Sequence, residues 1–540
     1  MYISKVNIFN YKCFEGKFTI EFNNAVNIIV GNNEAGKSTI LEAVHLALSG
    51  HLHGRFLMYK LSQYLFNRKV ELRYLESLKT KNKEMPPSII IEVFIKGENI
   101  ALFEGDGNSS REQECCITFK IEFDPIYQPA YEKLIESNEP VLSIPIEYYH
   151  VVWQSCAREA VTARSIPLKT MFIDSTTTRF QNGSDMYISS IVRNDLDEAE
   201  KVSISQSYRR LKENFMNDDA IRAINKKVSE KAGVSKKTVS ISVDLSTKDA
   251  WEGTLMTYLD DIPFHQIGKG EQCIIKTNLA LGHKKAKEKN LLLIEEPENH
   301  LSYSKLNEFI KRIDEQREDR QVIITTHSSF IANKLGLKNI ILLNANKAKR
   351  IADLKEDTQN FFMKLPGFDT LRLLLSKKIV LVEGPSDELI FQSAYMRRHN
   401  GNLPIENGID VLSVGLTFKR FLEMAELIEK DVAVITDNDG KYEEKISKKY
   451  EEYADSQFVK VFADKRDKLN TLEPQFVNVN KDNLKYLCEV IGISPSEYNT
   501  EELVSKYMQG NKTDWALSVF EKKHDLKYPE YIENAIDWCE

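Results

Sequence analysis

The stretch that decides the fold of the first half of the chain is Gly31–Thr39, which reads GNNEAGKST. It fits the pattern GxxxxGK[ST], in which backbone N–H groups surround a phosphate. The preceding residues Ala25–Val30 form an apolar run of strand length, and the apolar residues of Ser38–Leu48 have helical spacing. Because the pattern needs a strand before the loop and a helix after it, the sequence predicts a nucleotide-binding loop.

This loop is expected to bind ATP with Mg²⁺. In the general pattern the lysine, here Lys37, reaches the β- and γ-phosphates, and the hydroxyl of the next residue, Ser38, ligates the metal ion. A glycine is needed where a Cβ would keep the backbone away from a phosphate. The remaining loop residues expected to contact the nucleotide are Asn32, Asn33, Gly36 and Thr39.

A second part of the same site lies far downstream. The apolar run Leu291–Ile294 ends in two acids, Glu295 and Glu296. Such a strand can hold one carboxylate near the hydration shell of Mg²⁺ and another near the γ-phosphate. We therefore assign Glu295 to the metal shell and Glu296 to the general base for water. His327 follows the next apolar run, Gln321–Thr326, and is expected to contact the γ-phosphate.

A glycine-containing turn, GKGEQ at residues 268–272, precedes a helical stretch and offers a further anion site. This order of motifs resembles the ABC-type ATPase heads of the SMC and RecF group. The resemblance implies that ATP is sandwiched between two copies of the chain, with Gly270 and Gln272 acting in trans. It also implies a D-loop at residues 298–301 and a role for a glutamine upstream, for which Gln154 is the best candidate.

The last third of the chain places carboxylates after two predicted strands, Lys378–Val382 and Val432–Thr436. The four acids that share this position are Glu383, Asp387, Asp437 and Asp439. Acids at the carboxyl ends of parallel strands collect at one edge of the sheet. Four carboxylates this close are tolerable only if Mg²⁺ or Mn²⁺ neutralises them, or if some are protonated. Taken alone, the DNDG segment at 437–440 has a plain alternative, an ordinary turn.

This arrangement resembles a TOPRIM domain, the fold shared by topoisomerases, DnaG-type primases and some nucleases. An ATPase head followed by TOPRIM resembles the OLD (overcoming lysogenisation defect) family over nearly the whole chain. The nearest branches are the Gabija GajA-like and retron-associated ones, which serve in anti-phage defence. The resemblance implies that Glu473 completes a two-metal site and that Lys512 stabilises the charge of the transition state. Lys419 and Arg420 are the candidates for DNA contact.

The fold class expected is α/β, with an SMC- and RecF-like ATPase head and a C-terminal TOPRIM domain. The predicted boundaries are 1–175 and 237–369 for the ATPase, 176–236 for a helical insertion and 370–540 for TOPRIM. The charged helical stretch 195–229 inside the insertion has two readings, a solvated pair of surface helices or a dimerisation element. Residues 344–368 read as a linker, and 441–452 as an exposed helix face. A helix is expected over residues 55–80, and further strands are expected at Tyr2–Ile8, Phe18–Phe22, Ser88–Phe94, Cys116–Phe123, Ile144–Trp153 and Thr238–Val243.

Composition excludes several classes of protein. The chain has 540 residues, 42% of them hydrophobic and 28% charged, so it can bury a core and is not disordered. Its net charge of −7 argues against a generally basic protein that coats nucleic acid. The seven cysteines form no CxxC pair, which disfavours a zinc finger or a disulfide framework and fits a reducing cytoplasm. No apolar run approaches the roughly 20 residues that cross a bilayer.

The expected function is an ATP-regulated, metal-dependent DNA endonuclease. Its expected partners are DNA, a second copy or larger homo-oligomer, and a helicase or a retron reverse transcriptase with its RNA or DNA. One alternative is a non-nucleolytic, ATP-driven DNA clamp of the SMC/RecF type. Another is a topoisomerase-like or primase-like enzyme, although none of the 22 tyrosines sits in a recognisable nucleophile setting.

Overall fold

The computed structural model describes the chain in two compact units, residues 1–331 with 345–348, and residues 332–344 with 349–540. The structure describes most residues of both units. Those outside the description are 53–54, 58–60, 137–140, 175–179, 182–183, 186–195, 232–240, 242–250, 252–256, 283–290, 300, 317–319, 345–346, 365–371, 374–375 and 523–524.

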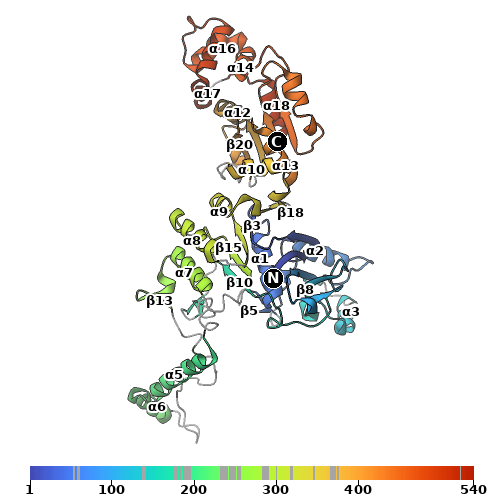
Figure 1. Cartoon of the computed structure of the whole chain (residues 1–540), viewed down its shortest axis with the longest axis vertical. Helices are drawn as coiled ribbons and strands as arrows, with labels where there is room; N and C mark the ends of the chain where they lie inside the picture. The colour runs from blue at the N-terminus through green and yellow to red at the C-terminus, as the bar shows by residue number, and fades with distance from the viewer. Residues whose placement is uncertain are drawn as a thin grey trace. The chain divides into compact units, whose positions relative to one another are not determined.

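The first unit begins with a six-stranded sheet in the order β2-β1-β6-β8-β7, with β9 also paired to β8 (Figure 1). Its strands are β1 (Tyr2–Phe9), β2 (Lys17–Glu21), β6 (Ile89–Lys96), β7 (Glu104–Gly105), β8 (Glu114–Phe123) and β9 (Tyr149–Ser155). The strands predicted near residues 2, 18, 88 and 116 are confirmed. The strand predicted from residue 144 begins later, at Tyr149, because Pro145 lacks an N–H for a ladder and a 3-10 turn follows it.

The second sheet carries the nucleotide loop. Its order is β10-β15-β16-β3-β17-β18, and its strands are β3 (Val26–Gly31), β10 (Thr170–Asp174), β15 (Leu291–Glu295), β16 (Gln321–Thr326), β17 (Ile340–Asn344) and β18 (Lys347–Arg350). The pairs β10·β15, β15·β16 and β16·β3 are parallel. Every residue of β3, β15 and β16 is buried, as expected for a parallel sheet covered on both faces. Their carboxyl ends therefore bring three distant segments to one edge.

The helices of this part are α1 (Lys37–Ser49), α2 (Arg68–Ser77), α3 (Gln128–Glu136), α5 (Glu198–Asn217), α6 (Asp219–Lys231), α7 (Lys269–Gly282), α8 (Tyr303–Gln316) and α9 (Ser329–Lys334). The short strand pair β4 (His51–Leu52) and β5 (Arg55–Phe56) and a 3-10 turn precede α2. The prediction of a helix over 55–80 is therefore wrong for its first half. The strand predicted at 238–243 lies, apart from Ile241, outside the described residues.

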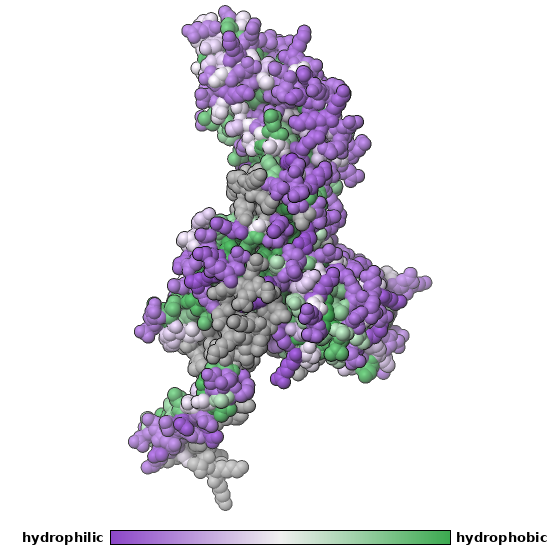
Figure 2. Space-filling model, viewed as in Figure 1, coloured by the Kyte–Doolittle hydropathy of each residue, from purple (hydrophilic) through white to green (hydrophobic). Residues whose placement is uncertain are grey.

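The helical character predicted for the insertion is confirmed by α5 and α6. Asp197 caps the start of α5 with a capping box. Its side chain accepts a hydrogen bond from the Glu200 N–H, and the Glu200 carboxylate accepts one from the Asp197 N–H. Several large apolar side chains are exposed on this pair: Val202, Leu211, Phe215 and Ile224. Figure 2 shows apolar residues mixed with hydrophilic ones over these helices. The dimerisation role stays a prediction.

The second unit contains a four-stranded, all-parallel sheet in the order β20-β19-β21-β22. The strands are β19 (Lys378–Val382), β20 (Ile409–Ser413), β21 (Val432–Ile435) and β22 (Val459–Phe462). The helices are α10 (Glu356–Lys364), α12 (Pro385–Arg398), α13 (Phe418–Ile428), α14 (Leu472–Val479), α15 (Leu484–Ile491), α16 (Glu501–Gly510), α17 (Lys512–Glu521) and α18 (Glu530–Cys539). One core joins the sheet to most of these helices, α10 and α13 excepted. Val380 of β19, Phe391 of α12, Phe476 of α14 and Trp515 of α17 belong to the same buried cluster.

Two further segments differ from prediction. Residues 344–368 are more than a linker, since they include β18 and α10. The charged run 441–452 is largely exposed, as predicted, but it forms a π-helical turn, Glu443–Lys448, followed by a 3-10 turn, Glu451–Tyr453. The predicted boundary near residue 370 stays a prediction.

A disulfide joins Cys116 to Cys156, which lie 40 residues apart in the sequence. The prediction disfavoured a disulfide framework, and this pair is a correction to it. No local spacing announces the pair, because only the antiparallel pairing of β8 with β9 brings the two residues together. Among the described helices, none has both the length and the apolar composition needed to cross a membrane.

Candidate functional site

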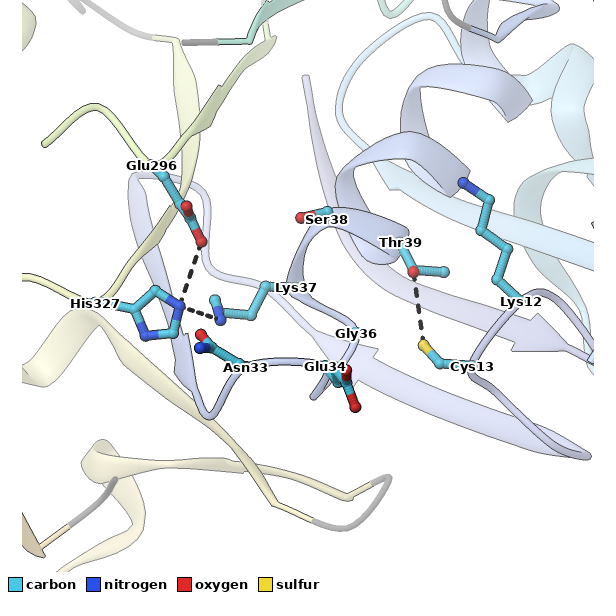
Figure 3. Close-up of a pocket in the computed structure, with 10 residues that line it drawn as sticks. All are labelled: Lys12, Cys13, Asn33, Glu34, Gly36, Lys37, Ser38, Thr39, Glu296 and His327. Carbon is cyan, nitrogen blue, oxygen red and sulfur yellow. Dashed lines mark hydrogen bonds and ion pairs between the residues drawn. The ribbon is translucent and has the colours of Figure 1, made fainter. Parts of the chain in front are cut away.

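The nucleotide loop is shaped by one glycine. Gly36 has φ +96°, and a Cβ at this position would lie 2.6 Å from the Phe14 ring and 2.8 Å from Cys13 Sγ. Only glycine fits this combination of backbone angle and close packing. Helix α1 begins at the next residue, Lys37, so its free N–H groups face the loop. The loop and the first turn of α1 therefore lie together, as the pattern requires, and phosphate binding there stays a prediction (Figure 3).

Lys37 is held by its own loop. Its ammonium donates to the carbonyl oxygens of Gly31 and Asn32, both at 3.1 Å, and lies 2.7 Å from His327 Nε2. Burial lowers the pKa of Lys37, while the nearby carboxylates of Glu296, Glu298 and Glu295 act in the opposite direction. A bound phosphate would offer this cation a stronger, charged acceptor.

His327 connects the lysine to the acids after β15. Its Nε2 is 3.3 Å from Glu296 Oε1, and Glu296 accepts a further hydrogen bond from Asn299 Nδ2 at 2.9 Å (Figure 3). Burial, and then the charge of Lys37, lower the pKa of His327, so the imidazole is neutral near pH 7. The structure thus places His327 and Glu296 where the sequence predicted them, at the edge of the loop.

Glu298 fixes the end of β16. Its Oε1 accepts from the Thr326 hydroxyl at 2.7 Å and from the backbone N–H of His327 at 2.6 Å. Sequence analysis assigned this residue only to the D-loop, and its position three residues past the end of an acidic strand was the available signal. Glu295 is buried at the end of β15. His300, part of the predicted D-loop, lies outside the described residues.

A cavity of about 540 Å³ lies over the loop. Its lining residues are Lys12, Cys13, Asn33, Glu34, Gly36, Lys37, Ser38, Thr39, Glu296 and His327. Most of them were predicted, but sequence analysis missed Lys12, Cys13 and Glu34. Lys12 and Cys13 follow β1, and nothing in their spacing from residue 31 indicates the approach. Cys13 Sγ lies 3.5 Å from the Thr39 hydroxyl, and Lys12 is ion-paired with Glu42.

Five predicted residues do not line this cavity: Asn32, Glu295, Gln154, Gly270 and Gln272. Gln272 is buried and donates to the carbonyl oxygens of Phe264 and Ile267, both at 2.9 Å, so it braces its own turn. Gly270 lies in the first turn of α7. Gln154 lies within β9, in register with Thr118 of β8. The role in trans expected for Gly270 and Gln272 stays a prediction.

The acids of the second unit gather where β19 and β21 end. These strands are parallel neighbours, with Leu381 in register with Val434. Glu383 follows β19, and its Oε1 accepts from the backbone N–H of Asp437 at 3.0 Å and from the Thr436 hydroxyl. Asp387 lies in the first turn of α12 and accepts from the Gly384 N–H at 3.0 Å.

Glu473 and Lys512 come from the helices that follow the sheet. Glu473 is 2% exposed in the first turn of α14, and Lys512 begins α17. Lys512 Nζ lies 3.8 Å from Glu473 Oε1, and the Thr471 hydroxyl donates to Glu473 Oε2 at 2.8 Å. The fold therefore brings together two residues that only a family resemblance had linked.

The charges of this group act on one another. Burial, and then the charge of Glu383, raise the pKa of Asp387 to about 7. Burial, followed by the charges of Asp387, Glu383 and Glu473, raise the pKa of Asp437 to about 9, while Lys512 lowers both values. We call Glu383, Asp387, Asp437, Glu473 and Lys512 the acid cluster.

Asp439 is not part of the acid cluster. Its backbone has φ +52°, its side chain is 53% exposed, and Oδ2 lies 3.8 Å from Lys445 Nζ. Asn438, between the two aspartates, is fully buried and donates to the carbonyl oxygens of Asp464, Arg466 and Leu469. This anchoring turns Asp437 inward and leaves Asp439 at the surface.

The donor set of the acid cluster fits a divalent cation. Its carboxylates raise one another's pKa, and a cation among them would offset that repulsion. The side chains are not preassembled as a ligand shell: within the described ranges, no three His, Cys, Asp or Glu side chains are placed to hold one ion together. Of the suggested DNA contacts, Lys419 pairs with Glu452 at 3.1 Å, and Arg420 lies 3.6 Å from Asp357.

Comparison with known proteins assigns both domains. Residues 1–332 match the family described as AAA ATPase domain, and residues 374–439 match the family described as Overcoming lysogenization defect protein-like, TOPRIM domain. No curated protein matches the chain significantly.

Solved structures similar to the chain include ATPase heads. An Smc head bound to the C-winged helix domain of ScpA is 14% identical, with 65% of this chain and 98% of that chain covered and a TM-score of 0.33. The SMC head domain from Thermotoga maritima is 13% identical (64% and 97% covered, TM-score 0.29), and RecF bound to ATP is 12% identical (60% and 93% covered, TM-score 0.32).

TM-scores this low give no support to a fold or family. The family of the chain therefore follows from the two family matches alone. The expected fold class, an α/β ATPase head followed by a TOPRIM domain, is confirmed by them. The chain belongs to the AAA ATPase domain family and, with its OLD-like TOPRIM domain, is a member of the OLD family of ATPase–TOPRIM proteins.

Proposed function

We propose that this protein is an ATP-regulated, divalent-metal-dependent DNA endonuclease whose phosphodiester cleavage takes place at the acid cluster. The observation that carries the proposal is the convergence of Glu383, Asp387, Asp437, Glu473 and Lys512 from four separate chain segments. Buried like charges are costly, and proteins keep them together mainly where a cation or a reaction uses them.

In this proposal the carboxylates of the acid cluster hold Mg²⁺ or Mn²⁺. Two such cations would supply an activated water and neutralise the leaving oxygen of an in-line displacement. Glu383 is oriented for this task by the Asp437 N–H and the Thr436 hydroxyl. Lys512, kept near the site by Glu473, places a positive charge where the phosphate becomes more negative. Asp439 would join only after turning inward from its surface position.

The ATPase part would regulate this cleavage. We propose that Lys37, with Asn32, Asn33, Gly36, Ser38 and Thr39, binds the triphosphate, and that Glu295 reaches the Mg²⁺ shell. Glu296, held by Asn299 and next to the neutral His327, would act as the general base for water. Gly270 and Gln272 of a second copy would close the site, so the active form is a homodimer or a larger homo-oligomer.

At a finer level, we propose that the protein is a cytoplasmic effector of anti-phage defence of the Gabija or retron type. Its partner would be a helicase, or a reverse transcriptase with its RNA or DNA. The alternative is a DNA clamp that uses ATP without cutting. The close approach of Lys512 to Glu473 favours cleavage, because a clamp has no need of a buried carboxylate paired with a cation beside three further acids.

The test is cleavage of plasmid DNA by the purified protein with Mg²⁺ or Mn²⁺, with and without ATP. Glu383→Gln is expected to abolish nicking and to leave ATP binding intact. Glu497→Gln, at an exposed position on a loop of the same unit, is the matched control and is expected to cut normally. Cleavage that survives Glu383→Gln would refute the proposal, as would a wild-type protein that binds DNA and never cuts it.

A further inference from the structure

The π-helical turn Glu443–Lys448 begins three residues after the DNDG segment. Single π-helical turns are rare and are frequently found at functional sites. Here Ile446 and Tyr450 are buried and anchor the turn, while Lys445 is exposed and Lys449 is half-buried. The turn therefore holds two lysines, four positions apart, beside the segment that carries Asp437.

Tyr450 has a hydroxyl that the described structure leaves without a partner. The side chain is 4% exposed, and its buried hydroxyl makes no hydrogen bond within the described residues. After burial, the charge of Glu383 is what raises the pKa of Tyr450, so the hydroxyl lies within electrostatic range of the acid cluster. An unpartnered buried hydroxyl is unfavourable unless a bound group or water completes it. This side of the acid cluster is thus equipped for a ligand.

Lys449 lies above this tyrosine. Its ammonium is 5.0 Å from the centre of the Tyr450 ring, and Lys449 takes part in no ion pair in the described part of the chain. Burial lowers its pKa, and it lies within electrostatic range of Glu383, Lys445 and Lys419. Lys449 therefore lies near Glu383 and near two further lysines, Lys445 of the π-helical turn and Lys419 of the first turn of α13.

The other two lysines have only weak partners. Lys445 lies 3.8 Å from Asp439, and Lys419 lies 3.1 Å from Glu452, with all four side chains about half exposed. Exposed ion pairs of this kind contribute little to stability. Both ammonium groups can therefore be transferred to a stronger acceptor, such as a phosphate, at small cost.

DNA approaching the acid cluster meets a strong repulsion. Four carboxylates face the phosphates there, and Lys512 is the cation of the cluster itself. Bound divalent cations would offset the carboxylates, but the phosphates on either side of the cleaved bond would still need positive charge. Neutralising such phosphates is the usual task of lysine and arginine at a nucleic-acid surface.

We propose that Lys419, Lys445 and Lys449 form a phosphate-binding rim that seats the DNA backbone beside the acid cluster. This inference rests on the proposed function and deepens it, since it names the residues that hold the substrate strand. Lys419 was already a candidate for DNA contact, whereas Lys445 and Lys449 come from the geometry of the π-helical turn. The rim contacts phosphates only, so it carries no preference for DNA sequence.

The test measures binding separately from cleavage. All variants are full-length and carry Glu383→Gln to stop cutting. Binding of a short fluorescein-labelled duplex is followed by anisotropy, with Mg²⁺, over a series of KCl concentrations. The rim variant combines Lys419→Gln, Lys445→Gln and Lys449→Gln. The matched control combines Lys481→Gln, Lys485→Gln and Lys506→Gln, three exposed lysines of the same unit. Retained ATP binding and an unchanged melting temperature verify the fold of each.

The rim variant is expected to bind more weakly and to lose about 2 to 3 from the slope of log K against log salt concentration, since each phosphate contact contributes about 0.9. The control is expected to keep its affinity for the duplex, and its slope is expected to change by less than about 0.9, the contribution of one phosphate contact. A rim variant that matches the control overturns the inference. If the duplex binds through the rim and the protein without Glu383→Gln never cuts, the rim stands and the nuclease proposal fails.

Discussion

Metal binding to the acid cluster should release protons, and the structure gives their number. With pKa values of about 9 and about 7, Asp437 is protonated and Asp387 is half protonated at neutral pH in the metal-free protein. A cation binds the ionised carboxylates. Binding at pH 7 should therefore release about 1.5 protons, and affinity should rise about 1,000-fold from pH 6 to pH 8, roughly 100-fold from Asp437 and roughly 10-fold from Asp387.

Isothermal titration calorimetry with Mn²⁺ counts these protons, because the measured heat changes with the ionisation enthalpy of the buffer in proportion to the number of protons released. Asp437→Asn removes one titrating group, so the release should fall to about 0.5 protons at pH 7. The stability of the metal-free protein should show the same coupling. Because the folded aspartates hold protons that the unfolded chain gives up above pH of about 4, stability should be full below that pH and fall as the pH rises toward 9. Metal binding without proton release, with equal affinity at pH 6 and pH 8, would refute the reasoning.

Three further outcomes follow from the contacts described. Gly36→Ala adds a Cβ 2.6 Å from the Phe14 ring at φ +96°, so it should abolish ATP binding in a filter assay and cost about 1–3 kcal/mol in urea unfolding; normal binding would contradict the loop geometry. Lys512→Met leaves Glu473 without its cation and should slow single-turnover cleavage about 100-fold or more with duplex affinity nearly unchanged; a pure loss of affinity would assign Lys512 to substrate binding instead. Glu296→Gln should keep ATP bound and reduce its hydrolysis at least about 100-fold, and unimpaired hydrolysis would exclude Glu296 as the base.

The local motifs were predictable because each depends on a short stretch of chain. The loop at Gly36 and Lys37 needs only its own residues, a strand and a helix, and all three are where the pattern put them. Likewise, the ends of β19 and β21 predicted the meeting of Glu383 with Asp437. Parallel pairing of buried strands leaves little freedom in where such acids go.

The features that the sequence did not reveal depend on long-range packing or on the conformation of a single backbone turn. Lys12 reaches the nucleotide cavity through the bend after β1, and Cys116 meets Cys156 through strand pairing. An alternating DxD pattern suggests that Asp437 and Asp439 share one ion, yet the buried Asn438 between them anchors the loop and leaves Asp439 outside. The π-helical turn has no periodicity that distinguishes it from an ordinary exposed helix.

The positions of Glu473 and Lys512 in the sequence have a consequence for when the acid cluster can assemble during synthesis. The sheet carries only part of the acid cluster, and the remaining members lie in the first turns of α14 and α17, which follow the sheet in the sequence. Synthesis proceeds from the N-terminus, so a nascent chain on the ribosome has its strands long before its last helices. Under the proposed function, a chain cut before α17 lacks Lys512 and carries an incomplete acid cluster, so we expect it not to cleave DNA.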